Sequence, residues 1–362
     1  MKKAAYFADK TNPKFSDRDN YSILGDNTGN EAFISSISKI IEVDRLERRL
    51  LRGNGSDLDN YDSFITSDLI WIRQNTDAPE SIKSLLDRFP DKPVVAISLG
   101  LQSNVYQPDF QLSKDMIHTL ERMNERATIA VRGAYTAEIL SKNGIKNFDI
   151  VGCPSVYQLP LYQKNYAPLL ASKTVQSATS NFRTFYEPLK AKEEEILLYF
   201  SQNCTGFVEQ TQLDFDRIKI ESSENHRKID TWLKNNRAYF FEASDWVSYC
   251  KNFDFSLGSR FHGNVMSVLA GVRALFLTTD TRTAELTEFF GVPSLPVSQF
   301  DPAKSIQEYY DMADYSKFIS SFHEKISNFC VFLAKNKLGI SKEYRAALDS
   351  FDFQRIGRPW AD

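Results

Sequence analysis

The sequence lacks several features that would assign it to a class at once. It contains only four cysteines, Cys153, Cys204, Cys250 and Cys330, and none forms a C-x-x-C pair, which argues against the common zinc modules and a disulfide-stapled fold. No apolar run approaches the roughly 18 residues of a membrane span, and no apolar stretch follows the basic N-terminus as in a signal peptide. We therefore expect buried, reduced thiols and a soluble protein of the cytoplasm.

A strong charge of one sign is missing as well. The 44 Lys and Arg residues and the 47 Asp and Glu residues leave a net charge of −3, which argues against a chain built mainly to neutralise nucleic-acid phosphates. The sequence contains no P-loop, no G-x-G-x-x-G fingerprint, no H-E-x-x-H and no G-x-S-x-G motif. We expect no nucleic-acid partner, no metal and no bound cofactor.

Short β-branched and aromatic runs alternate with helical patterns along most of the 362 residues. This alternation predicts an α/β protein with parallel sheets and helices on both faces of each sheet. The expected strands are 94–99, 127–131, 148–151, 196–200, 239–242, 253–257 and 274–278. The expected helices are 112–124, 134–143, 263–271 and 284–290.

One polar stretch interrupts the alternation. Residues 164–184 are rich in Ser, Thr and Asn, as is typical of a linker. We therefore divide the chain into an N-terminal domain of residues 1–165, a linker of residues 166–190 and a C-terminal domain of residues 191–362. A mainly helical tail is predicted from 304 to 350, because apolar residues recur there at helical spacing. Its apolar face consists of Phe318, Phe322, Ile326, Phe329 and Leu333.

Chemically active residues are densest between 253 and 293. Arg260 and His262 follow one expected strand and come directly before the helix expected at 263–271, and Arg282 follows the next expected strand. Ligands of open α/β sheets bind at the carboxyl ends of strands, where helix N-termini attract anions. These residues therefore predict a site for a small polyanion. The open alternative is that the two arginines are structural ion-pair partners and that the histidine is a packed turn residue.

Three blocks of sequence, in this order, resemble the polysaccharide pyruvyl transferase family. The first is G-D-N-T-G-N-E at 25–31, which is similar to an Asn/Gly-rich first loop of that family. The second joins V-R-G-A-Y-T-A-E-I-L at 131–140 to V-G-C-P-S at 151–155. The third joins G-S-R-F-H-G at 258–263 to D-T-R-T-A-E-L at 280–286. Their order and spacing make the resemblance far more specific than any one motif, although Gly133 stands where the family often has an acidic residue.

The resemblance implies a GT-B-like fold, in which two Rossmann-like domains face each other across a cleft. It also implies a transferase that moves the pyruvyl group of phosphoenolpyruvate to a sugar of a cell-surface polysaccharide or its precursor, often as a ketal. By this match, Arg260 and His262 are the catalytic residues, and Arg132 faces them from the N-terminal domain as a donor-binding residue. The open alternative for Arg132 is a surface or interdomain ion pair. The other expected donor-binding residues are Arg260 itself, Arg282, Ser259, Gly263 and Asn264.

Within the implied reaction, His262 is expected to be the general acid that protonates the methylene carbon of the donor, because imidazole titrates near neutral pH. Arg260 and Arg282 would hold the phosphate and stabilise it as it leaves. The base that removes the proton from the sugar hydroxyl stays open, with Asp26 and Asp254 as weak candidates.

The acceptor is expected on polar loops of the N-terminal domain. Asp26, Asn27 and Asn30 lie in the first loop, and Gln102 follows the strand expected at 94–99. Such side chains suit sugar hydroxyls. We expect a glycan acceptor, free or lipid-linked, with at most peripheral membrane contact. The alternative functions are a GT-B glycosyltransferase that uses a nucleotide sugar and a non-catalytic sugar-binding protein with the same fold.

Overall fold

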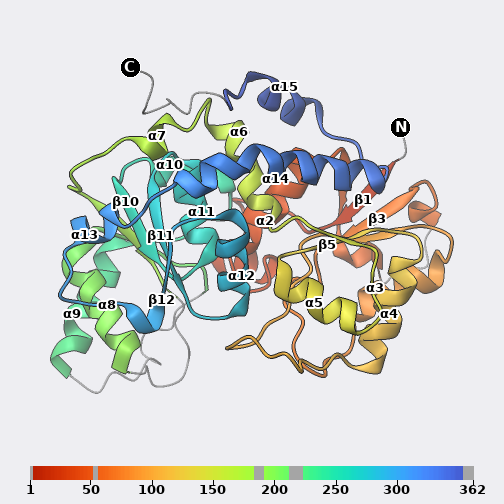
Figure 1. The fold of residues 1–362 in the computed structure, drawn as a ribbon, viewed down its shortest axis with the longest axis horizontal. Helices are drawn as coiled ribbons and strands as arrows, with labels where there is room; N and C mark the ends of the chain where they lie inside the picture. Colours follow the sequence, from red (N-terminus) through yellow and green to blue (C-terminus); the bar gives the residue numbers. More distant parts are fainter. Residues whose placement is uncertain (1–2, 52–55, 183–190, 212–222, 354–362) are drawn as a thin grey trace.

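The computed structural model describes residues 3–51, 56–182, 191–211 and 223–353. Two α/β units lie side by side, and the long helix α14 (Ser316–Lys335) runs across both (Figure 1). The observed architecture confirms the expected fold class, which is α/β and GT-B-like, with two Rossmann-like domains and a helical C-terminal region.

The N-terminal unit is built on a parallel sheet. Its strand order is β2 (Val43–Leu46), β1 (Ala4–Phe7), β3 (Ser63–Thr66) and β4 (Val94–Ala96). A parallel bridge between Leu99 and Val131 continues this order into β5 (Ile129–Val131) and β6 (Phe148–Ile150). Most of these strands are buried, which explains why they read as short continuous apolar runs.

The C-terminal unit has a second parallel sheet. Its strand order is β12 (Ser294–Pro296), β11 (Arg273–Thr278), β10 (Phe255–Gly258), β7 (Ala178–Asn181), β8 (Gly206–Val208) and β9 (Arg237–Ala238). If the strands are renumbered from 1 to 6 along the chain, starting with β7, the order read from β9 to β12 is 3-2-1-4-5-6, which is the Rossmann order. The direction of the order therefore reverses between β7 and β10, which is where such sheets bind ligands.

Helices cover the faces of both sheets. In the N-terminal unit they are α1 (Asp17–Ile23), α2 (Gly29–Ile40), α3 (Glu80–Arg88), α4 (Lys114–Asn124) and α5 (Ala134–Lys142). The short helices α6 (Leu159–Tyr162) and α7 (Ala167–Leu170) lead to the C-terminal unit. That unit contains α8 (Ala191–Asn203), α9 (Ser223–Asn236), α10 (Ala243–Cys250), α11 (Phe261–Leu269), α12 (Thr281–Phe290) and α13 (Ile306–Asp311), and α15 (Lys342–Ser350) follows α14. Of the helices that the structure describes, none is both long and apolar enough to span a membrane.

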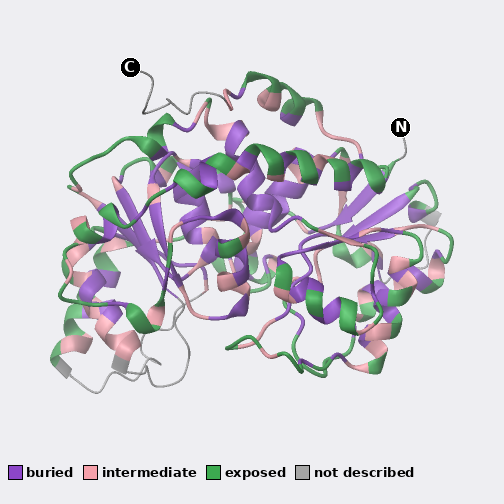
Figure 2. Cartoon of the chain, in the orientation of Figure 1, coloured by how far each residue is buried: buried purple, intermediate pink, exposed green. Residues whose placement is uncertain are grey.

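A continuous apolar core reaches from one unit into the other. It includes Tyr6 and Ile37 of the N-terminal unit, Leu257 and Met266 of the C-terminal unit, and Phe329 of α14. A second core lies on the other face of the N-terminal sheet, under α3 and α4. Buried residues concentrate in the two sheets and in the helices between them (Figure 2). The two units are therefore packed against each other and not merely tethered.

The C-terminal tail returns to the N-terminal unit. Near the end of α14, Lys335 forms an ion pair with Asp149 at 2.7 Å, and Asn336 Nδ2 donates to the Thr128 carbonyl at 3.2 Å. The apolar face predicted for the tail is confirmed, because its five residues are buried in α14. The tail was expected to belong to the C-terminal domain, but its end packs on the other unit.

Three sequence-based expectations need correction. Residues 178–181 fall in the expected linker but form β7, a central strand of the C-terminal sheet. Residues 196–200 were expected to be a strand and lie inside α8, because a short apolar run does not distinguish a buried strand from a buried helix. The strand expected at 239–242 is displaced to β9, which precedes it.

Candidate active site

The first feature of the site is the reversal of strand order between β7 and β10. At this point β7 ends in Asn181, and β10 ends directly before Ser259 and Arg260. The Asn181 side chain accepts a hydrogen bond from the Arg260 backbone N–H (2.8 Å) and donates to Asn264 Oδ1 (2.9 Å). The Asn181 carbonyl accepts from the Ser259 N–H at 3.0 Å. One side chain of β7 thus fixes the start of α11.

Helix α11 begins earlier than expected, at Phe261 instead of near Gly263 or Asn264. Phe261 is buried, and His262 lies in the first helical turn. The side chain of Asn264 is fully buried and bonds to Asn181, Ser256 and Gly258. It therefore positions the turn from inside, whereas a donor-binding role was expected for it.

Three arginines, which come from both units, act electrostatically on His262. Its Nε2 lies 3.5 Å from Sγ of Cys153. Burial lowers the pKa of His262 to about 3, and the positive charges of Arg132, Arg282 and Arg260 contribute to the shift. This lowered pKa favours the neutral imidazole near pH 7 in the unliganded protein, whereas the role of general acid expected from the sequence requires a proton on it. An anion bound among the arginines would offset their charge and raise this pKa again.

Arg132 follows β5 and is only 5% exposed. Its Nε donates to both the carbonyl and the hydroxyl of Ser98, each at 3.1 Å. Ser98 has a φ of +64°, an uncommon conformation for a residue other than glycine, and this conformation places both of its oxygens near the guanidinium. Gly100 leaves room for the arginine, because a Cβ there would lie 2.5 Å from Arg132 Cδ.

The charge of Arg132 has no acidic partner in ion-pair contact within the part of the chain that the structure describes. Burial lowers its pKa to about 10, so the guanidinium stays charged at neutral pH. A buried charge is costly unless an opposite charge is bound to it. The surface or interdomain ion pair considered for Arg132 is therefore not observed, and the geometry suits an anionic ligand.

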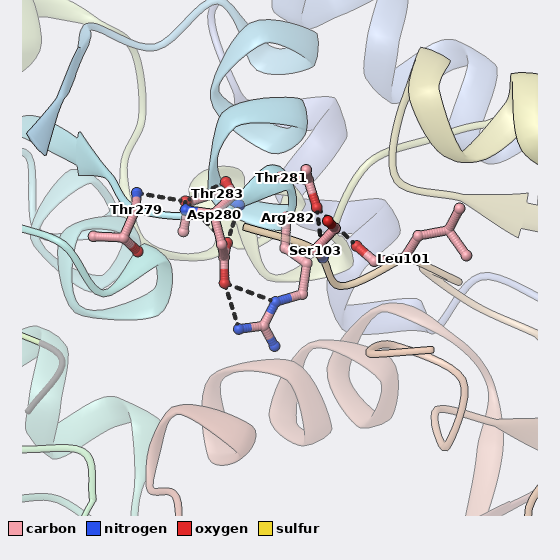
Figure 3. Close-up of polar contacts among 7 residues, drawn as sticks. All are labelled: Leu101, Ser103, Thr279, Asp280, Thr281, Arg282 and Thr283. Carbon is pink, nitrogen blue, oxygen red and sulfur yellow. Dashed lines mark hydrogen bonds and ion pairs between the residues drawn. The ribbon is translucent and has the colours of Figure 1, made fainter. Parts of the chain in front are cut away.

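The other two arginines differ in their partners. Arg260 is the N-cap residue of α11, and its Nη2 donates to the Thr211 hydroxyl at 2.8 Å. Arg282 lies in the first turn of α12, where its Nε and Nη2 both donate to Asp280 Oδ2, at 3.2 and 2.7 Å (Figure 3). Arg282 thus has the structural ion pair that was considered as an alternative. Its charge still lowers the pKa of both Arg132 and His262.

The start of α12 also joins the two units. Thr281 donates from its N–H to the Ser103 carbonyl at 3.0 Å and from its hydroxyl to the Leu101 carbonyl at 3.2 Å (Figure 3). One turn further, the buried carboxylate of Glu285 accepts from the N–H and the hydroxyl of Thr136, at 2.7 and 2.9 Å. These contacts hold α12 against the loop after β4 and the start of α5.

Gly133 departs from the family pattern, and Glu285 explains why. A Cβ at Gly133 would lie 2.2 Å from Glu285 Cγ. The acidic group near the start of α5 therefore comes from the opposite unit, and only glycine leaves space for it.

The acceptor candidates in the first loop lie directly before α2. Asn27 Oδ1 accepts from the Gly29 N–H at 3.0 Å, and Asn30 Nδ2 donates to the Leu24 carbonyl at 2.8 Å, so both amides stabilise the loop itself. Asp26 is exposed, with a φ of +56°.

This first loop approaches His262. A Cβ at Gly29 would lie 3.3 Å from His262 Nδ1. Gln102 comes from a different segment, and its N–H donates to the Ile72 carbonyl at 2.7 Å. The first loop is therefore next to the histidine, whereas the contacts of Gln102 are with the loop after β3.

Asp254 is not placed to act as the base. It precedes β10, at the amino edge of the sheet, whereas Arg260 follows the carboxyl edge. Its Oδ2 accepts from the backbone N–H groups of Gln176 and Ser177, at 3.0 and 3.2 Å. Its role is to anchor the segment that leads into β7.

Sequence reasoning missed two residues of the site, Asn181 and Gln210. Asn181 ends a strand of small polar residues, A-T-S-N, which carries no apolar signal. Gln210 follows β8 and is 3% exposed, and the apolar pair Phe207 and Val208 before it is the only hint of a strand. Within the described ranges, no group of three or more His, Cys, Asp or Glu residues is arranged to hold a metal ion.

A sequence profile of the family described as polysaccharide pyruvyl transferase matches residues 54–281. No curated protein matches the sequence.

Among solved structures, similar folds include the S. aureus MnaA–UDP complex (10% identity, 96% of this chain and 95% of that chain, TM-score 0.45). Another is Anabaena HepE in complex with UDP and glucose (11% identity, 97% and 96%, TM-score 0.40). A third is the UDP-GlcNAc 2-epimerase of Methanocaldococcus jannaschii (12% identity, 95% and 96%, TM-score 0.41). These TM-scores are all below 0.5, so the description of the fold rests on the strands and helices themselves.

Proposed function

The chain belongs to the polysaccharide pyruvyl transferase family and is a transferase that acts on polysaccharide, and on this premise we propose that its donor is phosphoenolpyruvate. The acceptor in this proposal is a sugar of a cell-surface polysaccharide, such as an exopolysaccharide, or of its precursor. The product is a pyruvyl ketal across two hydroxyls.

The observation that carries the proposal is the combined electrostatic effect of three guanidinium groups on His262. Arg132, Arg260 and Arg282 all lower the pKa of this imidazole, so all three lie within electrostatic reach of it. Phosphoenolpyruvate carries a phosphate and a carboxylate, which together match several cationic groups. Arg132 is buried without an acidic partner among the described residues, and this supports a ligand of high negative charge.

The reaction requires a proton on the methylene carbon of the donor. Protonation makes the adjacent carbon electrophilic, and the oxygen of one sugar hydroxyl then forms a bond to that carbon. The bond from this carbon to the phosphate oxygen breaks, inorganic phosphate leaves with its electron pair, and the second hydroxyl oxygen bonds to the same carbon. The two protons lost by the hydroxyls balance the one gained by the methylene and the one taken up by phosphate.

His262 is our candidate for the proton donor, under a condition that the structure adds. The imidazole is neutral in the unliganded protein, so it must gain its proton when the anionic donor offsets the arginine charges. Donor binding would therefore precede protonation and couple to proton uptake. Arg260 and Arg132 would stabilise the phosphate as it leaves, with Arg282 contributing while it remains bonded to Asp280.

The test is mass spectrometry of candidate glycans after incubation with phosphoenolpyruvate and the protein. A mass gain equal to one pyruvyl ketal, together with release of inorganic phosphate, is the expected result. Thermal shift provides a second measurement, because a ligand at about 100 times its Kd adds about 2.7 kcal/mol to the free energy of unfolding. Stabilisation by UDP- or CMP-sugars but not by phosphoenolpyruvate would instead favour a nucleotide-sugar glycosyltransferase.

We also propose that the reaction takes place in the cytoplasm, with the acceptor free or carried on a lipid. All four cysteines are free thiols, and three of them are buried, which suits a reducing compartment. Fractionation of cells followed by immunodetection checks this placement.

A further inference from the structure

Gln210 is a buried amide whose donor group has no partner. The residue follows β8 and is 3% exposed. Its backbone carbonyl accepts from the Thr28 N–H at 2.7 Å, which fixes the main chain beside the first loop. Its Nε2 is buried and makes no hydrogen bond to any residue that the structure describes. Leaving a buried donor unsatisfied is destabilising, so such a group calls for an explanation.

The amide of Gln210 lies between the first turns of two helices. Its Oε1 lies 2.4 Å from the position that a Cβ would take at Gly29, the first residue of α2. Its Nε2 lies 2.8 Å from the position of a Cβ at Gly263, in the first turn of α11. His262 Nδ1 also lies 3.3 Å from the Cβ position at Gly29. Two glycines therefore allow the amide to reach the immediate surroundings of the histidine.

The start of α11 offers further donors at the same place. No side chain caps this helix, although it is nine residues long. The backbone N–H groups of Phe261, His262 and Gly263 have no hydrogen-bond acceptor within the described part of the chain. A helix start with free N–H groups favours an anion. The unsatisfied Nε2 of Gln210 is an independent sign of the same preference, because it is also a donor without an acceptor.

We propose that Gln210 is a ligand-binding residue, whose Nε2 donates a hydrogen bond to an anionic oxygen held at the first turn of α11. The ligand class is a phosphate or carboxylate oxygen, and its identification with the donor phosphoenolpyruvate rests on the function proposed above. A neutral amide is suited to this position. It supplies a hydrogen bond to the anion without adding a fourth positive charge beside His262.

The experiment measures the affinity for two probes, phosphoenolpyruvate and inorganic phosphate, by calorimetric titration of the full chain. Gln210→Met keeps the approximate shape of the side chain and removes both hydrogen-bonding groups. We expect the affinity for each probe to fall by about 10- to 100-fold, since a hydrogen bond to a charged group contributes about 1.5–3 kcal/mol. The KM for phosphoenolpyruvate should rise by a similar factor. Gln210→Glu replaces the donor with a negative charge and should weaken binding further.

Gln163→Met is the matched control. It makes the same chemical change at the other end of α11, where Gln163 Nε2 donates to the Leu269 carbonyl at 2.8 Å. This variant should lower Tm and leave the affinity for both probes unchanged. If Gln210 only fills space, Gln210→Met will bind both probes within about two-fold of the unsubstituted protein, and the proposal is wrong. If Gln210→Met does not fold, the comparison of Gln210→Glu with the control decides the same question, with unchanged affinity again overturning the proposal.

The two proposals fail in different ways. If the protein pyruvylates a glycan and Gln210→Met retains the original KM for phosphoenolpyruvate, the role of Gln210 is refuted and the function stands. If phosphate binds in a Gln210-dependent manner but no glycan gains a pyruvyl group, the anion-binding role stands and the proposed function is refuted. If neither probe binds, both proposals are refuted.

Discussion

The starts of α11 and α12 invite comparison, because both follow a strand of the same sheet and both carry an arginine expected to bind an anion. At α12, Asp280 and Thr283 form a capping box, and Asp280 also binds Arg282 (Figure 3). At α11, no side chain caps the helix, and Arg260 is bonded to a neutral hydroxyl. The first start supplies its own anion, and for the second we propose that a ligand supplies it.

The two helix starts share one local pattern, a strand followed by a helix whose first residues include an arginine, but their contacts differ. The capped start of α12 bonds through Thr281 to the loop after β4, so it holds the two units together. The uncapped start of α11 lies at the reversal of strand order, next to His262 and Gln210. The structural role of α12 and the ligand-binding role proposed for α11 would thus belong to neighbouring helices. Substitutions at the two starts should therefore have separable effects.

The largest effect is expected from His262→Gln at the start of α11. Turnover should fall by about 10²- to 10⁴-fold, which is the usual contribution of general acid catalysis. Binding of phosphoenolpyruvate should persist, because the arginines remain. Phosphate release measures turnover, and calorimetric titration measures binding. Unchanged turnover with intact binding would rule out this histidine as the acid.

The next largest effect is a loss of affinity for phosphoenolpyruvate, which should be greater for a substitution of Arg260 than for one of Arg282. Arg260→Met should weaken the affinity for phosphoenolpyruvate by about 10- to 100-fold, because a charge-assisted hydrogen bond is lost. Arg282→Met should have a smaller effect on affinity, since Asp280 already offsets much of its charge. Calorimetric titration of both variants checks the order. Equal losses, or a greater loss at Arg282, would contradict the distinction between the two helix starts.

A third substitution tests the structural role of α12. Asp280→Ala should lower the free energy of unfolding by about 0.5–2 kcal/mol through the lost cap, and by more because Arg282 loses its buried partner. Denaturant titration measures this loss. The matched control is Ser305→Ala, which removes the capping box of α13 away from the site. A loss no greater than that of the control would show that the ion pair adds nothing to stability.

The smallest effect concerns pH. Folding lowers the pKa of His262 from its usual range near 6.5 to about 3, so the unfolded chain binds more protons between these values. Stability should therefore decrease as the pH falls below about 6.5. His262 is only partly buried. The free energy of unfolding should therefore decrease by less than about 1.4 kcal/mol per pH unit.

His262→Gln removes the titrating group and supplies the control for this pH dependence. Denaturant titrations between pH 5 and pH 7 compare the two proteins. The variant should lose less stability than the unsubstituted protein on acidification. Equal losses of unfolding free energy in the two proteins would show that other groups account for the pH dependence of stability.

Much of the fold followed from local patterns. The helices α4 and α5 and the apolar face of α14 were predicted closely, because their apolar residues recur at helical spacing over at least two turns. Short elements were less reliable. The apolar run at 196–200 is helical, and the polar run that forms β7 has no strand signal in its sequence. Its central position depends on pairing with β8 and β10, which are distant in the chain.

The sequence by itself determined the family and the two-unit α/β architecture, and it identified Arg132, Arg260 and His262 as candidate site residues, because these depend on residue types at fixed spacing. Only the tertiary structure decided which arginines have an acidic partner. Asp280 neutralises Arg282, whereas Arg132 is buried beside Ser98 without an acidic contact in the described chain. It also lowered the pKa of His262 and placed the amide of Gln210 beside the first turn of α11. The physical reason is that burial and electrostatic coupling depend on distances between segments remote in sequence, which no local pattern contains.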